Sequence, residues 1–501
     1  MTTRAIAAVL AGSTLLAGCN LAPTYVRPNL PVSPEFPQGP AYAAQPATAV
    51  APADIAWRDF FTDPKLVRLI ELSLANNRDL RVALANVAQA RAQYRVQRAD
   101  LFPTIGANGQ ATIQRSPGGI AATGGGIGGV GSGTGGIGSG TGGVGGGTGG
   151  TGAVTAGGIT TDIYSVSVGV SAWEIDLFGR VRNLSAAAFE QFLASEGARD
   201  AAQTALIAEL ATAYVTMAAD QDRLRIGQNT ERAFRQTLDL TLARFRGGIS
   251  SELEVSQART SYDQARADIA NATTLVAQDR NALNLLAGVT VPDELLPADL
   301  PAQGATLRDL PAGLSSAVLL RRPDIAQAEH QLRAANANIG AARAAFFPNI
   351  SLTAAFGTLS LGLGNLFGGG SDFWSVAPQA SVPIFDFGRN RGNLRYAEAS
   401  RDALVAQYER SVQSGFREVA DALARRGTIG AELQAQTSRR DAAAQAYRLS
   451  EARFRSGIDP FLNTLDSQRI LYEAQQTLLA ARLTQETNLV ELYRSLGGGL
   501  R

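Results

Sequence analysis

The sequence predicts a mainly α-helical chain with a smaller β portion, built from two tandem copies of one unit. Repetition is clearest in the segment ARFRGGI at 243–249, which returns as ARFRSGI at 452–458, 209 residues later. Phe-Gly-Arg at 178–180 returns at 387–389 with the same spacing. Period-two alternation before each Phe-Gly-Arg and a very long helical periodicity after it complete the pattern. Each copy therefore places strands before a long helical part.

Composition excludes several functional classes. The chain has 45 basic and 44 acidic residues and a formal charge of +1, without a basic stripe, so we expect no nucleic-acid partner. It has one His, His330, and one Cys, Cys19, which exclude Cys/His zinc clusters, intrachain disulfides and catalysis by two imidazoles. We expect no enzyme activity, no cofactor and no metal, with His330 a solvated residue on a helix.

The amino terminus is typical of a secretory signal peptide over residues 1–18. Arg4 precedes an apolar stretch that ends at Leu16 and is too short to span about 30 Å of hydrocarbon. Leu16-Ala17-Gly18-Cys19 resembles the bacterial lipobox, which implies cleavage before Cys19 and a lipid on its sulfur. Asn20, in place of the Asp of inner-membrane retention signals, indicates the outer membrane. The alternative is an ordinary signal peptide that ends near a Cys.

The amino-terminal part of the mature chain is expected to be a lipidated tether over residues 19–62. The first repeat then spans 63–290 and opens with a helix at 65–100, which ends before Phe102-Pro103 because proline cannot continue the helix. Residues 163–173 alternate Tyr and Val with Ser and Gly, which predicts a strand with one apolar face.

A glycine tract interrupts the first hairpin. Phe102-Pro103 and Phe347-Pro348 are 245 residues apart, 36 more than the other repeated motifs, so the first copy carries an insertion. Residues 118–158 contain 23 glycines in 41 positions and account for it. The tract has neither the Gly-Lys-Ser/Thr ending of a phosphate-binding loop nor collagen spacing, which favours a flexible extracellular loop.

Long helices follow each Phe-Gly-Arg. Gly248 and Gly457 are expected to supply the left-handed residue that ends the first helix of each pair. The helices are predicted at 182–246 and 251–287 in the first copy, and at 391–455 and 460–496 in the second. A linker at 291–320 leads to the second repeat at 321–497, with a helix at 323–345, strands near 350–356 and 374–384, and a tail at 498–501.

Four strands cannot form a stable membrane sheet by themselves, because open edges leave backbone groups unpaired in hydrocarbon. The sheet must therefore close across two, three or four chains, and three chains would give a 12-stranded pore. The long helices contain no 18-residue apolar run and are expected to continue this tube into an aqueous space.

The chain as a whole resembles the outer membrane factors of tripartite efflux pumps, the TolC-like lipoproteins. The resemblance rests on the lipobox, the duplicated unit, both Phe-Gly-Arg turns and both hairpin tips. It implies a homotrimer in the outer membrane, with a 12-stranded β-barrel continued by a periplasmic α-helical barrel. It also implies docking to a periplasmic adaptor and, through it, to an inner-membrane transporter. The expected function is a passive exit duct for drugs or other toxic small molecules.

Alternative functions remain open. The same duct can serve type I protein secretion or metal export, although the scarcity of His, Met and Cys disfavours soft metals. A trimeric adhesin or a structural coiled-coil lipoprotein belongs to a different class. The duplication of hairpin and helix pair disfavours that class, because a stalk needs only one strand-rich anchor per chain.

The resemblance implies adaptor contacts at the two hairpin tips. Glycine at a tip has the simpler explanation that it ends a helix, and leucine that it packs. The tip residues that we assign to adaptor contact are Arg246, Gly248, Ser250, Leu253, Arg455, Gly457, Leu462 and Asp466.

A second set of candidates lies in the second copy alone. Arg417, Asp421 and Arg425 are four residues apart on one predicted helix face, and the resemblance implies that Asp421 lines a closed periplasmic gate. The alternative is an ordinary surface pair of Asp421 with Arg425. The equivalent positions of the first copy hold Ala208, Thr212 and Thr216.

Overall fold

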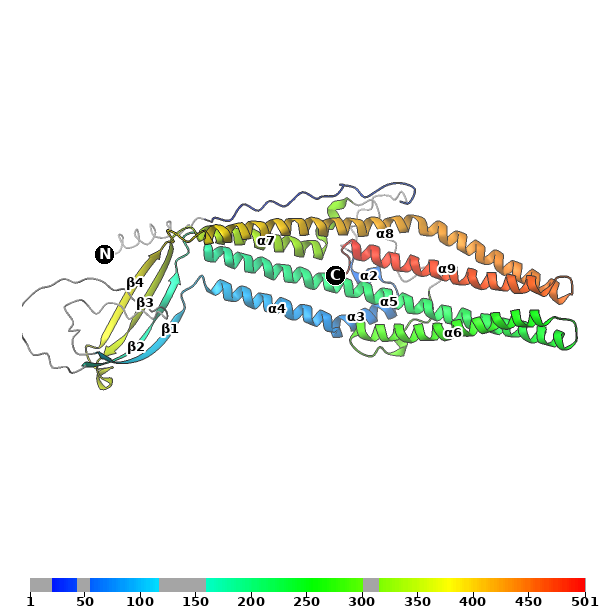
Figure 1. Cartoon of the computed structure of the whole chain (residues 1–501), viewed down its shortest axis with the longest axis horizontal. Helices are drawn as coiled ribbons and strands as arrows, with labels where there is room; N and C mark the ends of the chain where they lie inside the picture. Colours follow the sequence, from blue (N-terminus) through cyan, green and yellow to red (C-terminus); the bar gives the residue numbers. More distant parts are fainter. Residues whose placement is uncertain (1–19, 43–54, 117–158, 301–314, 501) are drawn as a thin grey trace, which may run out of the picture. The chain divides into compact units, whose positions relative to one another are not determined.

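A computed structural model describes four segments of the chain, which form two compact units (Figure 1). The signal segment, Cys19 and the glycine tract lie outside the described residues. The described segments are 20–42, 55–116, 159–300 and 315–500. Among the described residues, the sheet unit takes those within 99–177 and 345–385, and the helical unit takes those within 20–98, 178–344 and 386–500. Each unit therefore draws on both sequence repeats.

The sheet unit is one antiparallel sheet in the order β1-β2-β3-β4. Its strands are β1 (Ile105–Ser116), β2 (Ile159–Glu174), β3 (Asn349–Ser360) and β4 (Asp372–Ser381), with the short η4 (Leu363–Asn365) between the last two. The prediction of four strands is confirmed, and the two hairpins join because β2 pairs with β3. The predicted end at residue 384 is wrong, because β4 ends at Ser381, which pairs with Asn349, the first residue of β3.

One face of the sheet carries an uncovered apolar row. Ala107 is paired with Val168, Val168 with Phe356, and Phe356 with Trp374. Directly paired residues of an antiparallel sheet share a face. Val168, Phe356 and Trp374 are all exposed, and Trp374 retains 76% of its accessible surface. A single chain thus leaves a broad apolar stripe across the sheet.

The helical unit contains two long helices and their partners. Among the described residues, no helix is both long enough and apolar enough to cross a membrane. The helices are α2 (Trp57–Phe60), α3 (Pro64–Asn76), α4 (Arg78–Ala99), α5 (Arg180–Arg246), α6 (Glu252–Ala287), α7 (Pro323–Ala344), α8 (Arg389–Arg455) and α9 (Phe461–Ser495), with the short turns η2 (Asp293–Leu295) and η3 (Ser316–Arg321).

The two sequence repeats form equivalent helices. A spacing of 209 residues places the whole of α5 onto α8, each 67 residues long, and the start of α6 onto the start of α9. A spacing of 245 residues places α4 onto α7, each 22 residues long. The predicted helical hairpins are therefore confirmed, with α6 packed on α5 and α9 on α8.

The predicted single helix at 65–100 is wrong, because the chain breaks at Asn77 between α3 and α4. The Asn77 side chain accepts a hydrogen bond from the Leu80 N–H at 2.9 Å, which begins the new helix. Its amide also donates to the Leu286 carbonyl at 2.9 Å, near the end of α6. These two bonds at a buried side chain stabilise the break.

The second repeat makes the same junction with a different side chain. Arg322 corresponds to Asn77 at the spacing of 245 residues, and it donates to the Ser495 carbonyl at 2.8 Å. Ser495 corresponds to Leu286, the acceptor in the first repeat, at the spacing of 209 residues. Gly288 and Gly497 follow at equivalent positions, both left-handed with φ of 70° and 81°. A backbone carbonyl near the end of each helical hairpin therefore accepts a hydrogen bond from the start of a shorter helix, α4 in the first repeat and α7 in the second.

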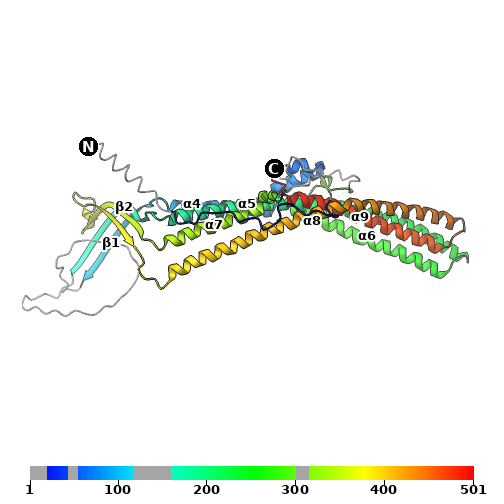
Figure 2. The same ribbon diagram turned by 90° about the horizontal axis from the view of Figure 1, so that it is seen from above.

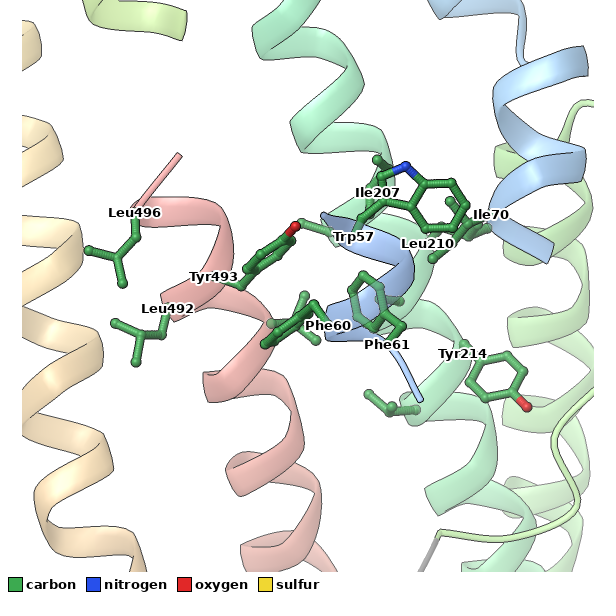
Figure 3. Close-up of a cluster of buried hydrophobic side chains, with 14 of the residues drawn as sticks. Trp57, Phe60, Phe61, Ile70, Ile207, Leu210, Tyr214, Leu492, Tyr493 and Leu496 are labelled. Atoms are coloured by element: carbon green, nitrogen blue, oxygen red, sulfur yellow. The ribbon is translucent and has the colours of Figure 1, made fainter. Parts of the chain in front are cut away.

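An aromatic cluster ties the two repeats together (Figure 3). Phe60 of α2 stacks on Tyr493 of α9 with ring centroids 4.0 Å apart, and Phe61 meets the same ring edge-on. The Tyr493 hydroxyl donates to the Ile55 carbonyl at 2.8 Å. Ile207 and Leu210 of α5 lie in the same core. The short α2 thus links α5 of the first repeat to α9 of the second.

The amino-terminal segment binds α7 through a buried carboxylate. Arg27 lies 2.9 Å from Glu329, and Arg333 pairs with the same carboxylate at 2.6 Å. Burial acts to raise the pKa of Glu329, but the hydrogen bonds from Arg333 and Arg27 outweigh it and lower this pKa. The Asn336 amide also donates to the Pro23 carbonyl at 2.7 Å. The predicted tether is therefore held on the helical unit over this part.

His330 is half-buried, so its prediction as a solvated residue is wrong. Its Nδ1 atom lies 2.7 Å from the Glu190 carboxylate, which joins α7 to α5.

The junction glycines allow a matched test. A Cβ at Gly288 would lie 2.4 Å from the Asn76 carbonyl oxygen, whereas one at Gly248, with a similar φ of 74°, would meet nothing within 4 Å. Gly248→Ala should cost only the left-handed strain, about 1 kcal/mol. Gly288→Ala should cost clearly more and lower the melting temperature followed by circular dichroism. Equal losses in the two variants would contradict the packing role of Gly288.

Candidate functional site

The two hairpin tips have the same backbone turn. In the first tip the Gly248 N–H donates to the Phe245 carbonyl and the Ile249 N–H to the Arg244 carbonyl, both at 2.9 Å. The second tip repeats these bonds from Gly457 and Ile458 at 3.0 and 2.9 Å. Since Gly248 and Gly457 both have a left-handed φ, these predicted adaptor-contact glycines are required by the turn itself.

The tips are held side by side by a small apolar core (Figure 1). Phe454 and Phe461 of the second hairpin lie with ring centroids 5.6 Å apart and share a cluster with Phe234 and Leu238 of α5. The Arg244 guanidinium lies 4.8 Å from the centre of the Phe454 ring. The two tips therefore form one surface within a single chain.

That surface presents aliphatic side chains ringed by charge. The exposed aliphatic residues form two pairs at equivalent positions of the repeats. Arg246 and Asp466 are exposed, and Arg455 pairs with Glu451 at 2.7 Å. Ser250 is half-buried and donates to Glu254. The pairs are Ile249 with Ile458 and Leu253 with Leu462.

Ile249 and Ile458 lie in the two tip segments identified from the sequence, but they were not among the residues assigned to adaptor contact. The repeated ARFR-Gly-Ile segment carries the signal, because an isoleucine that directly follows a helix-ending glycine projects from the tip. An exposed apolar patch with a polar rim is typical of a protein-protein contact.

The tips differ in one ion pair. Arg453 binds Asp459 at 2.6 and 2.9 Å, and this hydrogen-bonded pair lowers the pKa of Asp459. The equivalent residues of the first tip are Arg244 and Ser250, so Arg244 has no matching carboxylate and lies over Phe454 instead.

The charged residues predicted at the gate lie on the face of α8 that is exposed in a single chain. Arg417 and Asp421 are exposed, on the side of the helix opposite to the buried residues Val412 and Val419. Arg425 lies 3.2 Å from Glu432, so its partner is not Asp421 and the alternative surface pair is wrong. Within the described segments, Asp421 has no ion-pair partner within 4.0 Å.

A buried ion network lies behind these charges. Glu418 binds Arg322 at 2.9 Å and Arg494 at 3.1 Å, which joins α8 to the start of α7 and the end of α9. The Arg322 side chain is only 5% exposed and also pairs with Asp324 at 2.8 Å. Only Arg322 is fully buried and its partners are partly exposed, so removing one partner should cost less than the loss of about 3–5 kcal/mol expected for a fully buried pair. The network therefore fixes the helix turn that presents Arg417 and Asp421.

A carboxyl pair between α5 and α6 is a second feature absent from the sequence analysis. Asp279 faces Asp220, which is buried and paired with Arg223. Burial, followed by the charge of Asp220 and a hydrogen bond to it, raises the pKa of Asp279 to about 6. Helix periodicity does not reveal this contact, because it depends on how α6 packs on α5.

Across residues 20–42, 55–116, 159–300 and 315–500, no group of three or more His, Cys, Asp or Glu side chains is arranged to hold a metal ion. The features that stand out in these segments are the exposed tips and the free charged face of α8.

Known proteins similar to this chain share both repeats. The family model for outer membrane efflux proteins matches residues 69–289 and 314–498. The antibiotic efflux pump outer membrane protein ArpC and the toluene efflux pump outer membrane protein TtgC, both of Pseudomonas putida, are each 45% identical over 99% of this chain and 96% of their own length. The open-state structure of the Neisseria gonorrhoeae MtrE outer membrane channel is 35% identical, with a TM-score of 0.82 over 96% of this chain and 99% of that one.

The carboxyl pair predicts a pH effect on stability. Because the folded protein raises the pKa of Asp279 from 3.8 to about 6, its stabilising contribution is present at low pH and is lost as the pH rises through about 6. The melting temperature of the parent should therefore fall between pH 4 and 7. Asp279→Asn should reduce this fall, because asparagine does not titrate. Asp263→Asn, an exposed change on the same helix, should leave the pH profile unchanged. Parallel profiles for Asp279→Asn and the parent would contradict the carboxyl pair.

Proposed function

Because the chain belongs to the outer membrane efflux protein family, we propose that it is the outer-membrane exit duct of a tripartite efflux system. It conducts cargo passively from a periplasmic adaptor and an inner-membrane pump to the outside. The observation that carries this proposal is the family match over both repeats, each of which contributes one exposed hairpin tip. Family membership also argues against an adhesin or a purely structural lipoprotein.

The proposed assembly is a homotrimer. Four strands with an apolar face leave β1 and β4 as edges, and edges in a membrane must be paired. Three copies close a 12-stranded barrel, and the uncovered row from Val168 to Trp374 faces lipid. The helical units of the three copies together form the periplasmic barrel.

The proposed anchor is a lipid on Cys19, the residue at which the lipobox-like segment ends. It adds a tether to the outer membrane and is not required for the barrel to span it. Mass spectrometry of the mature protein should find the lipid, and an unmodified Cys19 would contradict it.

The proposed cargo is small organic molecules of low polarity. ArpC and TtgC are named for antibiotics and toluene, and the similarity extends over nearly the whole chain. Protein secretion and metal export are the alternatives. A strain that lacks the chain should become sensitive to toluene and antibiotics, whereas sensitivity to a metal salt alone would support the alternative.

The proposed adaptor surface is the joint tip. Ile249, Ile458, Leu253 and Leu462 supply the apolar centre, and the tip charges supply the rim. Among the residues that we assigned from the sequence, the exposed members Arg246, Leu253, Leu462 and Asp466 fit this role, as does Arg455 beside Glu451.

The proposed gate is a ring of Asp421 carboxylates, one from each copy, beside Arg417. Support comes from the free face on which both residues lie and from the Glu418 network that holds this turn in place. A ring of carboxylates in a water-filled constriction favours cations. Arg425, the third residue that we assigned to the gate from the sequence, pairs with Glu432.

Charge reversal at the tip tests adaptor docking. Arg246→Glu should weaken binding to the adaptor about tenfold, which corresponds to about 1.4 kcal/mol, and should lower antibiotic resistance of the complemented strain. Arg98→Glu, an exposed change on α4, is the matched control and should leave both unchanged. Unaltered crosslinking of Arg246→Glu to the adaptor would remove the tip charge from the docking surface.

Planar-bilayer recordings test the gate. Asp421→Ala should reduce the preference for cations, because it removes all three carboxylates of the ring. Asp441→Ala, which changes an exposed carboxylate further along α8, should keep the parent selectivity. If Asp421→Ala keeps the parent selectivity and conductance, Asp421 is a helix-surface residue without a gate role.

A further inference from the structure

The sheet has a polar face opposite to its apolar row. Asn108 of β1 is paired with Ser167 of β2, and Ser167 with Gly357 of β3. The strands lie side by side in one layer (Figure 1), and the turned view also shows β2 beside β1 (Figure 2). Most side chains on this polar face are small or carry a hydroxyl or amide group. In the barrel proposed above, the polar face lines the water-filled pore.

Acidic and basic residues of the sheet are divided unequally between its two faces. Arg115, Asp162 and Asp372 lie on the apolar face, near the end of β1 and the starts of β2 and β4. Among the described residues of the four strands, Glu174 is the only acidic or basic residue on the polar face. It is the last residue of β2. One carboxylate per chain therefore interrupts a face whose described side chains are otherwise uncharged.

Alternation along β2 is broken by one extra residue. Val168 and Val170 lie on the apolar face, and strict alternation would also place Glu174 there. The pairing with β3 shifts between Val170 and Trp173, which is the mark of a β-bulge. Beyond the bulge, Trp173 therefore takes the apolar face and Glu174 the polar face.

The neighbours of both residues agree with this reversal. Trp173 is paired with Leu352, which makes an apolar pair. Glu174 is paired with Ser351, and Ser351 with Gln379 of β4. The last row of the sheet before α5 is therefore polar across β2, β3 and β4, with the carboxylate at its β2 end.

The bulge is fixed by the backbone and by one side chain. Ala172 has a left-handed φ of 50°, which residues other than glycine rarely adopt. It lies outside the paired residues of β2 and β3, and its N–H donates to the Thr353 hydroxyl at 3.1 Å. Strain of this kind persists only where the surrounding structure holds it, and bulges at barrel rims redirect side chains.

The second copy has no equivalent carboxylate. At the spacing of 209 residues, Glu174 corresponds to Pro383, which follows the end of β4 at Ser381. Each chain therefore contributes one carboxylate at this level of the sheet, and a homotrimer contributes three.

We propose that Glu174 is the residue of the barrel wall that discriminates cargo by charge, as one of three equivalent carboxylates around the pore. The proposal rests on the homotrimeric duct proposed above and adds a position in the sheet to it. A ring of carboxylates in a water-filled pore favours cations. Organic cations therefore pass this level more readily than anions of the same size.

Thiol labelling of the reconstituted protein tests which side chains face the pore. Glu174→Cys and Ser167→Cys should react with a charged, water-soluble methanethiosulfonate about tenfold faster than Trp173→Cys, because the polar face lines water and the apolar face lies against lipid. The parent protein, whose one cysteine is Cys19, gives the background.

The labelling rates separate two kinds of failure. If Ser167→Cys is labelled but Glu174→Cys reacts no faster than Trp173→Cys, the reversal at the bulge is overturned and the barrel stays in place. An unlabelled Ser167→Cys would contradict the barrel itself, and the proposal with it.

Planar-bilayer recordings in a KCl gradient test the charge. Glu174→Gln should lower the ratio of potassium to chloride permeability about twofold, which is the Boltzmann factor for one unit charge about 10 Å away in water. Gln379→Glu combined with Glu174→Gln returns a carboxylate to the same row and should restore the parent ratio. A purely structural role of Glu174 would not be rescued in this way.

Gln379→Glu alone keeps Glu174 in place and adds a second carboxylate to the row. It should raise the permeability ratio, so the charge is also tested by a variant that retains the native residue. An unchanged ratio in both Glu174→Gln and Gln379→Glu would overturn the charge discrimination.

Discussion

Part of the long helix α5 is covered by a helix of the other repeat, and much of the architecture follows from this constraint. Helix α5 packs against α7, which belongs to the other repeat, and Phe60, in the segment that precedes the first repeat, lies in one core with α5 and with Tyr493 of the second repeat. A chain with one copy would have neither contact. Because apolar burial is the main favourable term in folding, the contacts between the two copies contribute to the stability of both.

The repeats keep the backbone contact that ends each hairpin but change the side chain that makes it. Asn77 serves in the first copy and Arg322 in the second, and both donate to the equivalent carbonyl. The Asn77 amide donates to Leu286 at this junction, whereas the Arg322 guanidinium has further donors and also reaches Glu418. The substitution thereby gives the second copy a charged network that the first lacks, next to the charges on α8. The second copy therefore has an added charged network, while both copies keep the same hydrogen bond at the end of the helical hairpin.

Much of the fold was predictable because the two repeats of the chain can be compared with each other. The motifs at Phe178 and Phe387, with the glycines at the tips, locate both helical hairpins to within one or two residues. The break at Asn77 was missed, since no glycine or proline marks it and its cause is a carbonyl more than 200 residues away. The repeated motif predicts which residues lie at each tip, but it does not predict that the two tips pack together into one surface. Asp279 was missed for a related reason, because its environment is created by helix packing.

The equal length of α5 and α8 limits how this chain can change during evolution. Each helix has 67 residues, so both tips end at the same level and share one apolar core. One residue inserted into α5 alone would advance its tip by about 1.5 Å and turn it by about 100°. Phe234 and Leu238 would then no longer meet Phe454. Changes in the reach of the helical hairpins are therefore tolerated only when both copies change together, which makes the duplication a lasting restraint on length.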